Sequence, residues 1–261
     1  MNLNFFDIQR LGNIELISFL NEKHASAQTW EFFTELVDLV NEIENDDNIL
    51  VAIFTGKGNH FSAGLDFNDF LNRFGNLIGN NSENLYEIIK MMQKGMNLLF
   101  DGNKIYIAAI NGYCIGSGLD FISACDFRFC SSNAIFCLKE TQLGIIADLG
   151  SLQRLPYIIG FSNTKKLALT SENIDSEIAL KIGLVSEVFE NKEKMISEVI
   201  KFSQNIAKNP KNAIFGSKKY INNLLKSTIF TQLDDIARFN ANNLNLKNIK
   251  NNLPSIFKKE S

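Results

Sequence analysis

Hydrophobic and polar positions along the chain first follow a strand pattern and then a helix pattern. Residues 6–20 contain two β-rich runs separated at Leu11-Gly12-Asn13, which predicts a hairpin. From residue 27 the apolar side chains recur every three or four positions as far as Ile43, so we expect an amphipathic helix that ends near the acidic residues 44–48. The continuous apolar run of residues 49–56 then predicts a buried strand.

This order of helix and buried strand repeats farther along the chain. Residues 82–100 have helical periodicity, and residues 104–110 form a second continuous apolar run. The segments that follow are predicted as a short helix after residues 111–118, strands at 127–131, 134–138 and 184–189, and helices at 150–160 and 162–170. Beyond residue 191 only helical patterns remain.

These patterns predict an α/β fold with a helical region at its C-terminal end. We place the α/β core in residues 1–191 and the helical region in residues 192–261. The apolar faces of these last helices need a surface to cover them, so we expect them to dock on the core or on a neighbouring copy of the chain. The Asn- and Lys-rich residues 244–252 are expected to be loosely ordered.

Composition and charge restrict the class of protein. A chain of 261 residues, 45% of them hydrophobic, is long enough for one large buried core. Its formal net charge of −3 leaves no excess of positive charge for a polyanion, so nucleic acid is not expected as a partner. No apolar run is long enough for a membrane span, and neither a signal peptide nor a transit peptide is recognisable; we therefore expect no membrane span and a cytoplasmic location.

The cysteines and histidines do not have the spacing of a metal site. The four cysteines lie in apolar surroundings without a CxxC pair, and His24 and His60 are far apart in the sequence. We therefore expect reduced thiols in the core and no metal ion.

Two turns that contain glycine are candidates for binding an anionic oxygen. Gly64 permits a tight turn that leaves the N–H of Leu65 free to point at a ligand. Gly116 and Ser117 lie between a predicted strand and a predicted helix, so the N–H of Ser117 is expected at a helix N-terminus. Each turn alone is more often purely structural, but two such donors together would form an oxyanion hole.

Three acidic residues follow these turns among apolar neighbours. Asp120 lies at the start of the predicted short helix, and Glu140 and Asp148 follow the strand at 134–138. Asp120 and Asp148 could also be helix caps, and Glu140 could form a surface ion pair with Lys139. Three acids and two glycine turns, taken together, nevertheless favour a catalytic site.

With these motifs the chain resembles the crotonase, or enoyl-CoA hydratase/isomerase, superfamily over its whole length. The segment CIGSGLDFISACDFRFCSSNAIFCLKETQLGIIADLGSLQRLPYIIG is most similar to the Δ3,5-Δ2,4-dienoyl-CoA isomerases, which have acids at all three positions. The resemblance implies a spiral of ββα units with C-terminal helices that build a homotrimer, often paired into a hexamer. It also implies an acyl-CoA thioester as substrate and no separate cofactor.

The resemblance assigns roles to individual residues. The N–H groups of Leu65 and Ser117 would hold the thioester oxygen, and Asp120, Glu140 and Asp148 would be the catalytic acids. Asp148 is the discriminating residue, because a typical hydratase has glycine there. The remaining substrate contacts are assigned to Lys23, Ala25, Ala63, Gly64, Asp66 and Gly116. The loop at Lys23 and Ala25 is shorter than in the family, and Ser117 replaces the middle glycine of its usual Gly-Gly-Gly.

The sequence therefore predicts an isomerase that converts 3,5-dienoyl-CoA to 2,4-dienoyl-CoA in fatty-acid β-oxidation. Such a reaction needs a stabilised thioester oxygen and two carboxyl groups that exchange protons at the two ends of the diene. Two alternatives stay open at this point: an enoyl-CoA hydratase that uses Asp120 and Glu140 to activate water, and a non-catalytic acyl-CoA-binding protein of the same fold.

Overall fold

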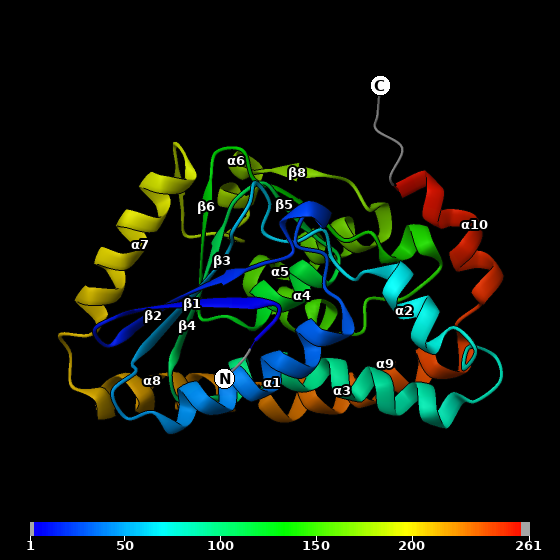
Figure 1. Cartoon of the computed structure of the whole chain (residues 1–261), viewed down its shortest axis with the longest axis horizontal. Helices are drawn as coiled ribbons and strands as arrows, with labels where there is room; N and C mark the ends of the chain where they lie inside the picture. Colours follow the sequence, from blue (N-terminus) through cyan, green and yellow to red (C-terminus); the bar gives the residue numbers. More distant parts are fainter. Residues whose placement is uncertain (1–2, 257–261) are drawn as a thin grey trace.

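The computed structural model describes residues 3–256 and has an α/β architecture (Figure 1). Neighbouring strands of the larger sheet are parallel, except for the antiparallel hairpin of β1 and β2. In spatial order this sheet consists of β1 (Phe6–Leu11), β2 (Ile14–Phe19), β3 (Val51–Gly56), β4 (Ile105–Ile110), β6 (Phe127–Ser131) and β9 (Glu187–Phe189). The predicted α/β fold and the N-terminal hairpin are confirmed.

A smaller sheet brings together the two segments that lead to Gly116 and to Glu140. It has the spatial order β5 (Tyr113–Ile115), β7 (Ile135–Cys137) and β8 (Ile174–Asp175). Parallel pairing aligns Ile115 with Cys137, and the N–H of Gly116 donates to the carbonyl of Cys137 at 2.8 Å. The residues that follow β5 and β7 therefore lie at one edge of this sheet.

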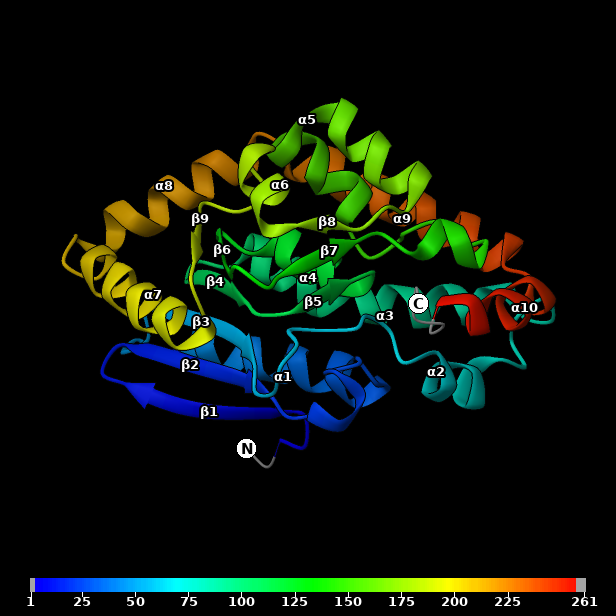
Figure 2. The ribbon, with the colours of Figure 1, turned by 90° about the horizontal axis from the view of Figure 1, so that it is seen from above.

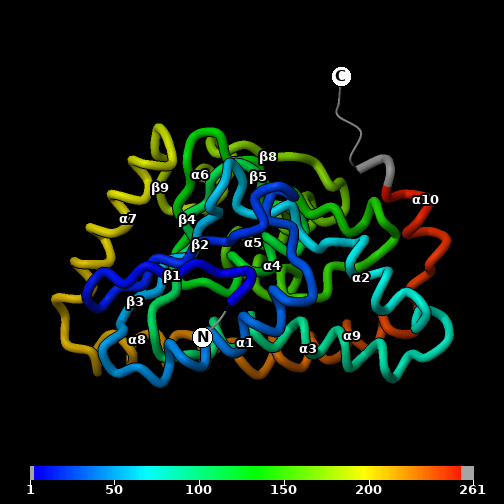
Figure 3. Tube along the Cα trace, viewed as in Figure 1, coloured from blue at the N-terminus to red at the C-terminus, as the bar shows by residue number. Residues whose placement is uncertain are grey.

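The helices before residue 191 surround the two sheets. α1 (Trp30–Asn45) and α3 (Ser82–Asp101) lie side by side, as Figures 1 and 3 show. α5 (Ser151–Thr170) consists of two helices that meet at a kink, where Gly160 has non-helical backbone, as predicted for residues 150–160 and 162–170. The others are η1 (Glu22–His24), α2 (Phe67–Phe74), α4 (Ser117–Ala124), η2 (Glu140–Leu143) and α6 (Ser176–Lys181).

The C-terminal helices dock on the core of their own chain. They are α7 (Lys192–Ile206), α8 (Lys211–Asn223), α9 (Lys226–Asn243) and α10 (Leu246–Ile256). α7 packs against β4, β6 and β9, whereas α9 packs against α3 and α5, and Figure 2 shows these helices along two sides of the molecule. The expectation that residues 244–252 are loosely ordered was wrong, because α10 packs on η2 and buries Ile249.

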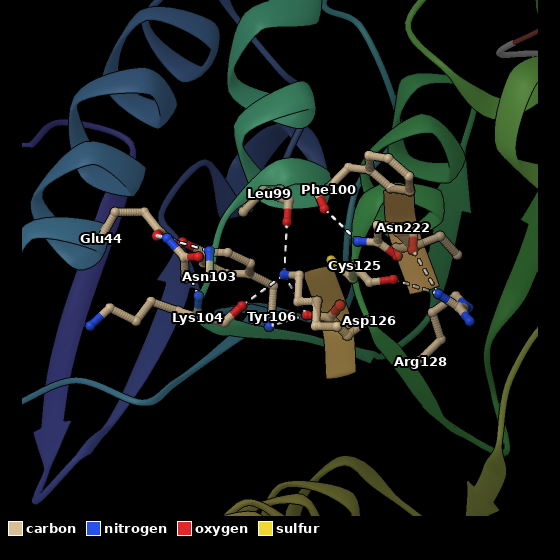
Figure 4. A network of polar contacts seen from close by, with 12 residues as sticks. Glu44, Leu99, Phe100, Asn103, Lys104, Tyr106, Cys125, Asp126, Arg128 and Asn222 are labelled. Carbon is tan, nitrogen blue, oxygen red and sulfur yellow. Dashed lines mark hydrogen bonds and ion pairs between the residues drawn. The ribbon is translucent and has the colours of Figure 1, made fainter. Parts of the chain in front are cut away.

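A buried lysine ties α8 to the core. Lys218 donates to the carbonyl oxygens of Leu99 and Lys104 at 3.1 and 2.7 Å and to Oδ2 of Asp126 at 2.8 Å. Its ammonium also lies 4.7 Å from the centre of the Tyr106 ring. Figure 4 shows the partners of this lysine: Leu99 near the end of α3, Lys104 and Tyr106 at the start of β4, and Asp126 just before β6. Both charges of the ion pair are removed from solvent, so each depends on the other.

Some apolar surface stays uncovered in the single chain. Phe161 and Leu169 on α5 are 64% and 72% exposed, and Tyr220 and Leu224 at the end of α8 are 76% and 80% exposed. Such side chains are what self-association would cover. Among residues 3–256, no helix has the length and apolar character that crossing a membrane requires.

Candidate active site

A cavity of about 90 Å³ lies where β5 meets α4. Its wall is mostly apolar and includes Phe67 and Phe70 of α2, Met92 of α3, and Ile249 of α10. The three predicted acids line the same cavity. A larger hollow of about 500 Å³ between α4, α5 and α8 contains none of them, so the smaller cavity is the candidate active site.

The first glycine turn places the N–H of Leu65 beside this cavity. Gly64 has φ +89°, and a Cβ there would lie 2.7 Å from the carbonyl oxygen of Ile115 and 3.5 Å from the nitrogen of Ser117. Only glycine fits both this backbone conformation and this close approach. The two turns therefore touch each other.

The second turn begins α4. Gly116 has φ +52°, and a Cβ there would lie 3.0 Å from Oε1 of Glu140. Ser117 is the first residue of α4, so its N–H has no acceptor within the helix. Within the described part of the chain, the N–H groups of Leu65 and Ser117 have no hydrogen-bond acceptor. Two unpaired donors at adjoining turns are the arrangement that an oxyanion hole requires.

Asp120 is the most deeply buried of the three acids, at 1% exposure. Its Oδ1 accepts a hydrogen bond of 2.6 Å from the N–H of Ser151 at the start of α5. Burial raises the pKa of Asp120, whereas the hydrogen bonds from Ser151 and the charge of Arg154 lower it. Of the three acids, Asp120 is therefore the one whose negative charge its surroundings stabilise most.

Glu140 begins η2, three residues after Cys137, the last residue of β7. Burial raises its pKa, and repulsion from Asp120 and Asp148 raises it further. Its Oε2 is buried and has no hydrogen-bond partner among the described residues. A carboxyl group in this environment holds a proton near neutral pH.

Asp148 accepts hydrogen bonds from residues of α9 and α3. Its Oδ2 accepts a hydrogen bond of 2.6 Å from Nδ2 of Asn240 on α9, and its backbone carbonyl accepts one of 2.7 Å from Nε2 of Gln93 on α3. Burial raises the pKa of Asp148 to about 7; the bond from Asn240 lowers it and repulsion from Asp120 raises it. This carboxyl group can therefore gain or lose a proton near neutral pH.

The residues that support the three acids could not be recognised from the sequence. Arg154 lies almost fully buried behind them and donates to Oδ1 of Asn97 at 2.6 Å and to the carbonyl of Leu149 at 3.3 Å. Asn240 lies far along the chain, in a segment where asparagine is common. No local signal distinguishes these residues, because their contacts exist only in the folded chain.

The structure does not bring all predicted substrate contacts into the cavity. Ala63, Gly64 and Gly116 line it. Lys23 in η1 is exposed, Ala25 pairs with Ala63 through a backbone hydrogen bond of 2.9 Å, and the Asp66 carboxylate caps α2. These last three residues are not part of the cavity lining, and their contact with substrate stays a prediction.

The chain is similar to a known protein family and to several known proteins. The family model for enoyl-CoA hydratase/isomerase matches residues 9–256. The peroxisomal Δ(3,5)-Δ(2,4)-dienoyl-CoA isomerase of Arabidopsis thaliana is 36% identical over 84% of this chain and 80% of its own length. The mitochondrial enzyme of that name from Dictyostelium discoideum is 35% identical over 88% of this chain and 80% of its own length. A short-chain-enoyl-CoA hydratase of Clostridium acetobutylicum is 31% identical over 89% of this chain and 87% of that protein.

Solved structures show the same fold. The enoyl-CoA hydratase from Bacillus halodurans superposes with a TM-score of 0.86 at 25% identity and covers 97% of this chain and 100% of its own. A Thermobifida fusca protein with a TM-score of 0.77 and 23% identity, covering 90% of this chain and 94% of its own, was crystallised in complex with acetoacetyl-CoA.

The expected cytoplasmic location is contradicted by these relatives. The dienoyl-CoA isomerases of Arabidopsis thaliana, Dictyostelium discoideum and Homo sapiens are named as peroxisomal or mitochondrial proteins. Composition and buried thiols suit any reducing compartment, so they could not separate the cytosol from an organelle.

Proposed function

Since the chain belongs to the enoyl-CoA hydratase/isomerase family, whose members are enzymes of the crotonase superfamily, we propose that it is a Δ3,5-Δ2,4-dienoyl-CoA isomerase of fatty-acid β-oxidation. The family and the relatives make it an acyl-CoA isomerase or hydratase. The observation that supports the isomerase is Asp148, a third acid that lines the same cavity as Asp120 and Glu140. Its pKa of about 7 suits proton exchange at neutral pH.

The thioester oxygen binds between the N–H groups of Leu65 and Ser117. Removal of a proton from C2 places negative charge on this oxygen, and each preorganised donor stabilises that charge by roughly 3 kcal/mol. Both N–H groups are unpaired among the described residues, so they need no rearrangement to accept the oxygen. The apolar walls from α2, α3 and α10 enclose the acyl chain.

Glu140 and Asp148 transfer the protons. One carboxylate removes the C2 proton, the electron pairs of the diene shift toward the thioester, and the other carboxylic acid donates a proton to C6 as the conjugated system re-forms. One proton leaves the substrate and one enters it, so the reaction is redox-neutral and needs no cofactor beyond the CoA of the substrate.

The mechanism needs one of the two groups, Glu140 or Asp148, to be ionised and the other to be protonated, and their surroundings favour this state. Burial and repulsion from Asp120 raise the pKa of both Glu140 and Asp148, so the cluster does not release all of its protons at neutral pH. Asp120 is fixed by the Ser151 N–H and has the support of Arg154, so it contributes a standing negative charge beside the pair.

Two substrates test the proposal. Purified protein is incubated with 3,5-dienoyl-CoA and, separately, with 2-enoyl-CoA, while absorbance of the conjugated diene and loss of the enoyl thioester are followed. The proposal expects the first reaction to be faster. Hydration alone would support the hydratase, which the Clostridium relative favours, and binding without turnover of either thioester would support a non-catalytic acyl-CoA-binding protein.

Deuterium exchange separates the roles of the two acids. In the variants Glu140→Gln and Asp148→Asn, exchange of the C2 hydrogen with heavy water is measured beside isomerisation. The variant that still exchanges this hydrogen without isomerising lacks the donor for C6. The variant that does neither lacks the base for C2.

A further inference from the structure

Ser117 has a hydroxyl group at the position where its N–H is assigned to the oxyanion hole. This hydroxyl donates a hydrogen bond of 2.6 Å to Oε1 of Gln28. Both residues are buried, with Gln28 at 0% and Ser117 at 4% exposure. Nε2 of Gln28 has no partner among the described residues, so the contact with Ser117 is the one polar interaction of this side chain that the structure shows.

The main chain of Gln28 holds the other half of the oxyanion hole. Its N–H donates to the carbonyl of Gly64 at 2.8 Å, and its carbonyl accepts from the N–H of Asp66 at 2.9 Å. This is parallel pairing with Leu65, in which the N–H of Leu65 points away from Gln28. Gln28 thus contacts both segments that supply the assigned donors.

Elsewhere within residues 3–256, the hydrogen bonds between these two segments lie upstream of the donors. The N–H of Ile115 donates to the carbonyl of Ser62 at 2.9 Å, and the N–H of Ser62 donates to the carbonyl of Tyr113 at 2.8 Å. No such bond joins Leu65 to Ser117 themselves. Among residues 3–256, Gln28 is therefore the residue whose hydrogen bonds connect the Leu65 segment to Ser117 next to the two donors.

We propose that Gln28 is a positioning residue that sets the separation and direction of the Leu65 and Ser117 N–H groups. This inference rests on the proposed function, because it assumes that the two groups bind the thioester oxygen. Catalytic donors must be held to within about 0.5 Å, and a hydrogen bond away from water keeps one geometry better than packing alone. The Ser117 side chain, which stands where the resemblance to the crotonase superfamily implies a glycine, is the group that binds Gln28.

Three variants test this role. Gln28→Met keeps the length of the side chain without a good acceptor, Ser117→Ala keeps the N–H without the hydroxyl, and the third variant combines both changes. Gln153→Met is the matched control, because Gln153 is also buried, with an unpartnered Oε1, and does not line the cavity. Circular dichroism and thermal melting verify that each variant is folded.

The measurements separate positioning from folding. Each single variant should lower kcat for dienoyl-CoA about tenfold with little change in KM, and the double variant should fall no further, because both changes remove one hydrogen bond. The infrared carbonyl band of bound, isotope-labelled 2,4-dienoyl-CoA should shift toward its free frequency in all three. Gln153→Met should match the unaltered protein in both readouts.

Other results contradict the proposal. Unchanged kcat and unchanged carbonyl frequency in folded Gln28→Met and Ser117→Ala would overturn it, and so would losses that multiply in the double variant. Absence of isomerisation by the unaltered protein contradicts the proposed function instead. In that case, the bound thioester can still show a shifted carbonyl band. If Gln28→Met removes that shift, the result supports the positioning role without the proposed function.

Discussion

Asn240 donates a hydrogen bond of 2.6 Å from its side-chain nitrogen to Oδ2 of Asp148. The same nitrogen donates to the carbonyl oxygen of Ile146 at 2.7 Å, which fixes the orientation of the amide. An N–H group bonds to an unprotonated oxygen, so a proton on Asp148 must reside on Oδ1. Helix α9, which lies far from the other site residues in the sequence, therefore determines which oxygen of Asp148 can exchange a proton.

We predict that Asn240→Leu raises the pKa of Asp148 above its value of about 7 by roughly one unit, because the carboxylate loses a donor that favours its charged form. The limb of the pH–rate profile that belongs to Asp148 should move to higher pH, whether Asp148 acts as acid or as base. Asn242→Leu on the same helix is the control, because the Asn242 side chain is exposed and donates to the carbonyl oxygen of Arg238 on its own helix. An unchanged profile in folded Asn240→Leu would contradict this relationship.

Asp148→Asn should reduce dienoyl-CoA isomerisation by roughly 100-fold or more, because the amide cannot exchange a proton. It preserves the size of the side chain and an oxygen that accepts from Asn240. Asp235→Asn, at an exposed position, is the matched control and should leave turnover unchanged. Near-normal isomerisation by folded Asp148→Asn would leave the hydratase as the better proposal.

The same variant should change how stability depends on pH. The pKa of Asp148 is raised from 3.8 to about 7, so the folded chain retains a proton that the unfolded chain releases. Stability from this site is therefore complete below about pH 4 and is lost as the pH rises through 7. We expect the melting temperature of Asp148→Asn, relative to the unaltered protein, to increase by several degrees from pH 5 to pH 8. A constant difference across this range would show that Asp148 has an ordinary pKa.

The sequence revealed those site residues whose chemical type is informative by itself. Acids among apolar neighbours and glycines after predicted strands could be recognised without a structure, and Asp120, Glu140 and Asp148 do line one cavity. Gln28 and Asn240 could not be recognised, because their partners Ser117 and Asp148 are 89 and 92 residues away in the chain.

The helices and strands could likewise be predicted only where a segment has a clear hydrophobic pattern of its own. β3 and β4 were predicted because each is buried along its whole length and forms one continuous apolar run. β8 has two residues, which is too short for any periodicity to appear, and β5 lies inside the glycine-containing segment 111–118, which shows no strand pattern of its own. α10 was missed because its composition is polar and its single buried face, at Ile249, is set by contact with η2.

We predict that the chain forms a homotrimer or a hexamer in solution, because Phe161, Leu169, Tyr220 and Leu224 leave apolar surface uncovered. Light scattering of the purified protein at micromolar concentration tests this. The double variant Tyr220→Glu, Leu224→Glu should yield smaller species, whereas Lys219→Glu on the same helix is the charge control. A clean monomer mass for the unaltered protein would contradict the prediction.

Removal of residues 192–261 tests the division between the α/β core and the C-terminal helical region. α7 covers β4, β6 and β9, and α9 covers α3 and α5, so the shortened chain would expose apolar surface over much of the core. We expect aggregate instead of a smaller soluble protein. A soluble, cooperatively melting fragment would show that residues 1–191 fold without these helices.

Lys218, whose partner Asp126 is labelled in Figure 4, offers the sharpest test of how the C-terminal helices are attached. Lys218→Met leaves the Asp126 carboxylate buried without its cation, which should reduce the free energy of unfolding by about 3–5 kcal/mol. Lys226→Met is the matched control: Lys226 also joins the C-terminal region to α3, through Asp101, but both side chains are 39% exposed, so the cost should stay below about 1 kcal/mol. Urea denaturation measures both values. Because the loss in Lys218→Met comes from an uncompensated charge, adding Asp126→Asn should restore part of the stability, and equal losses for both lysines would contradict this account.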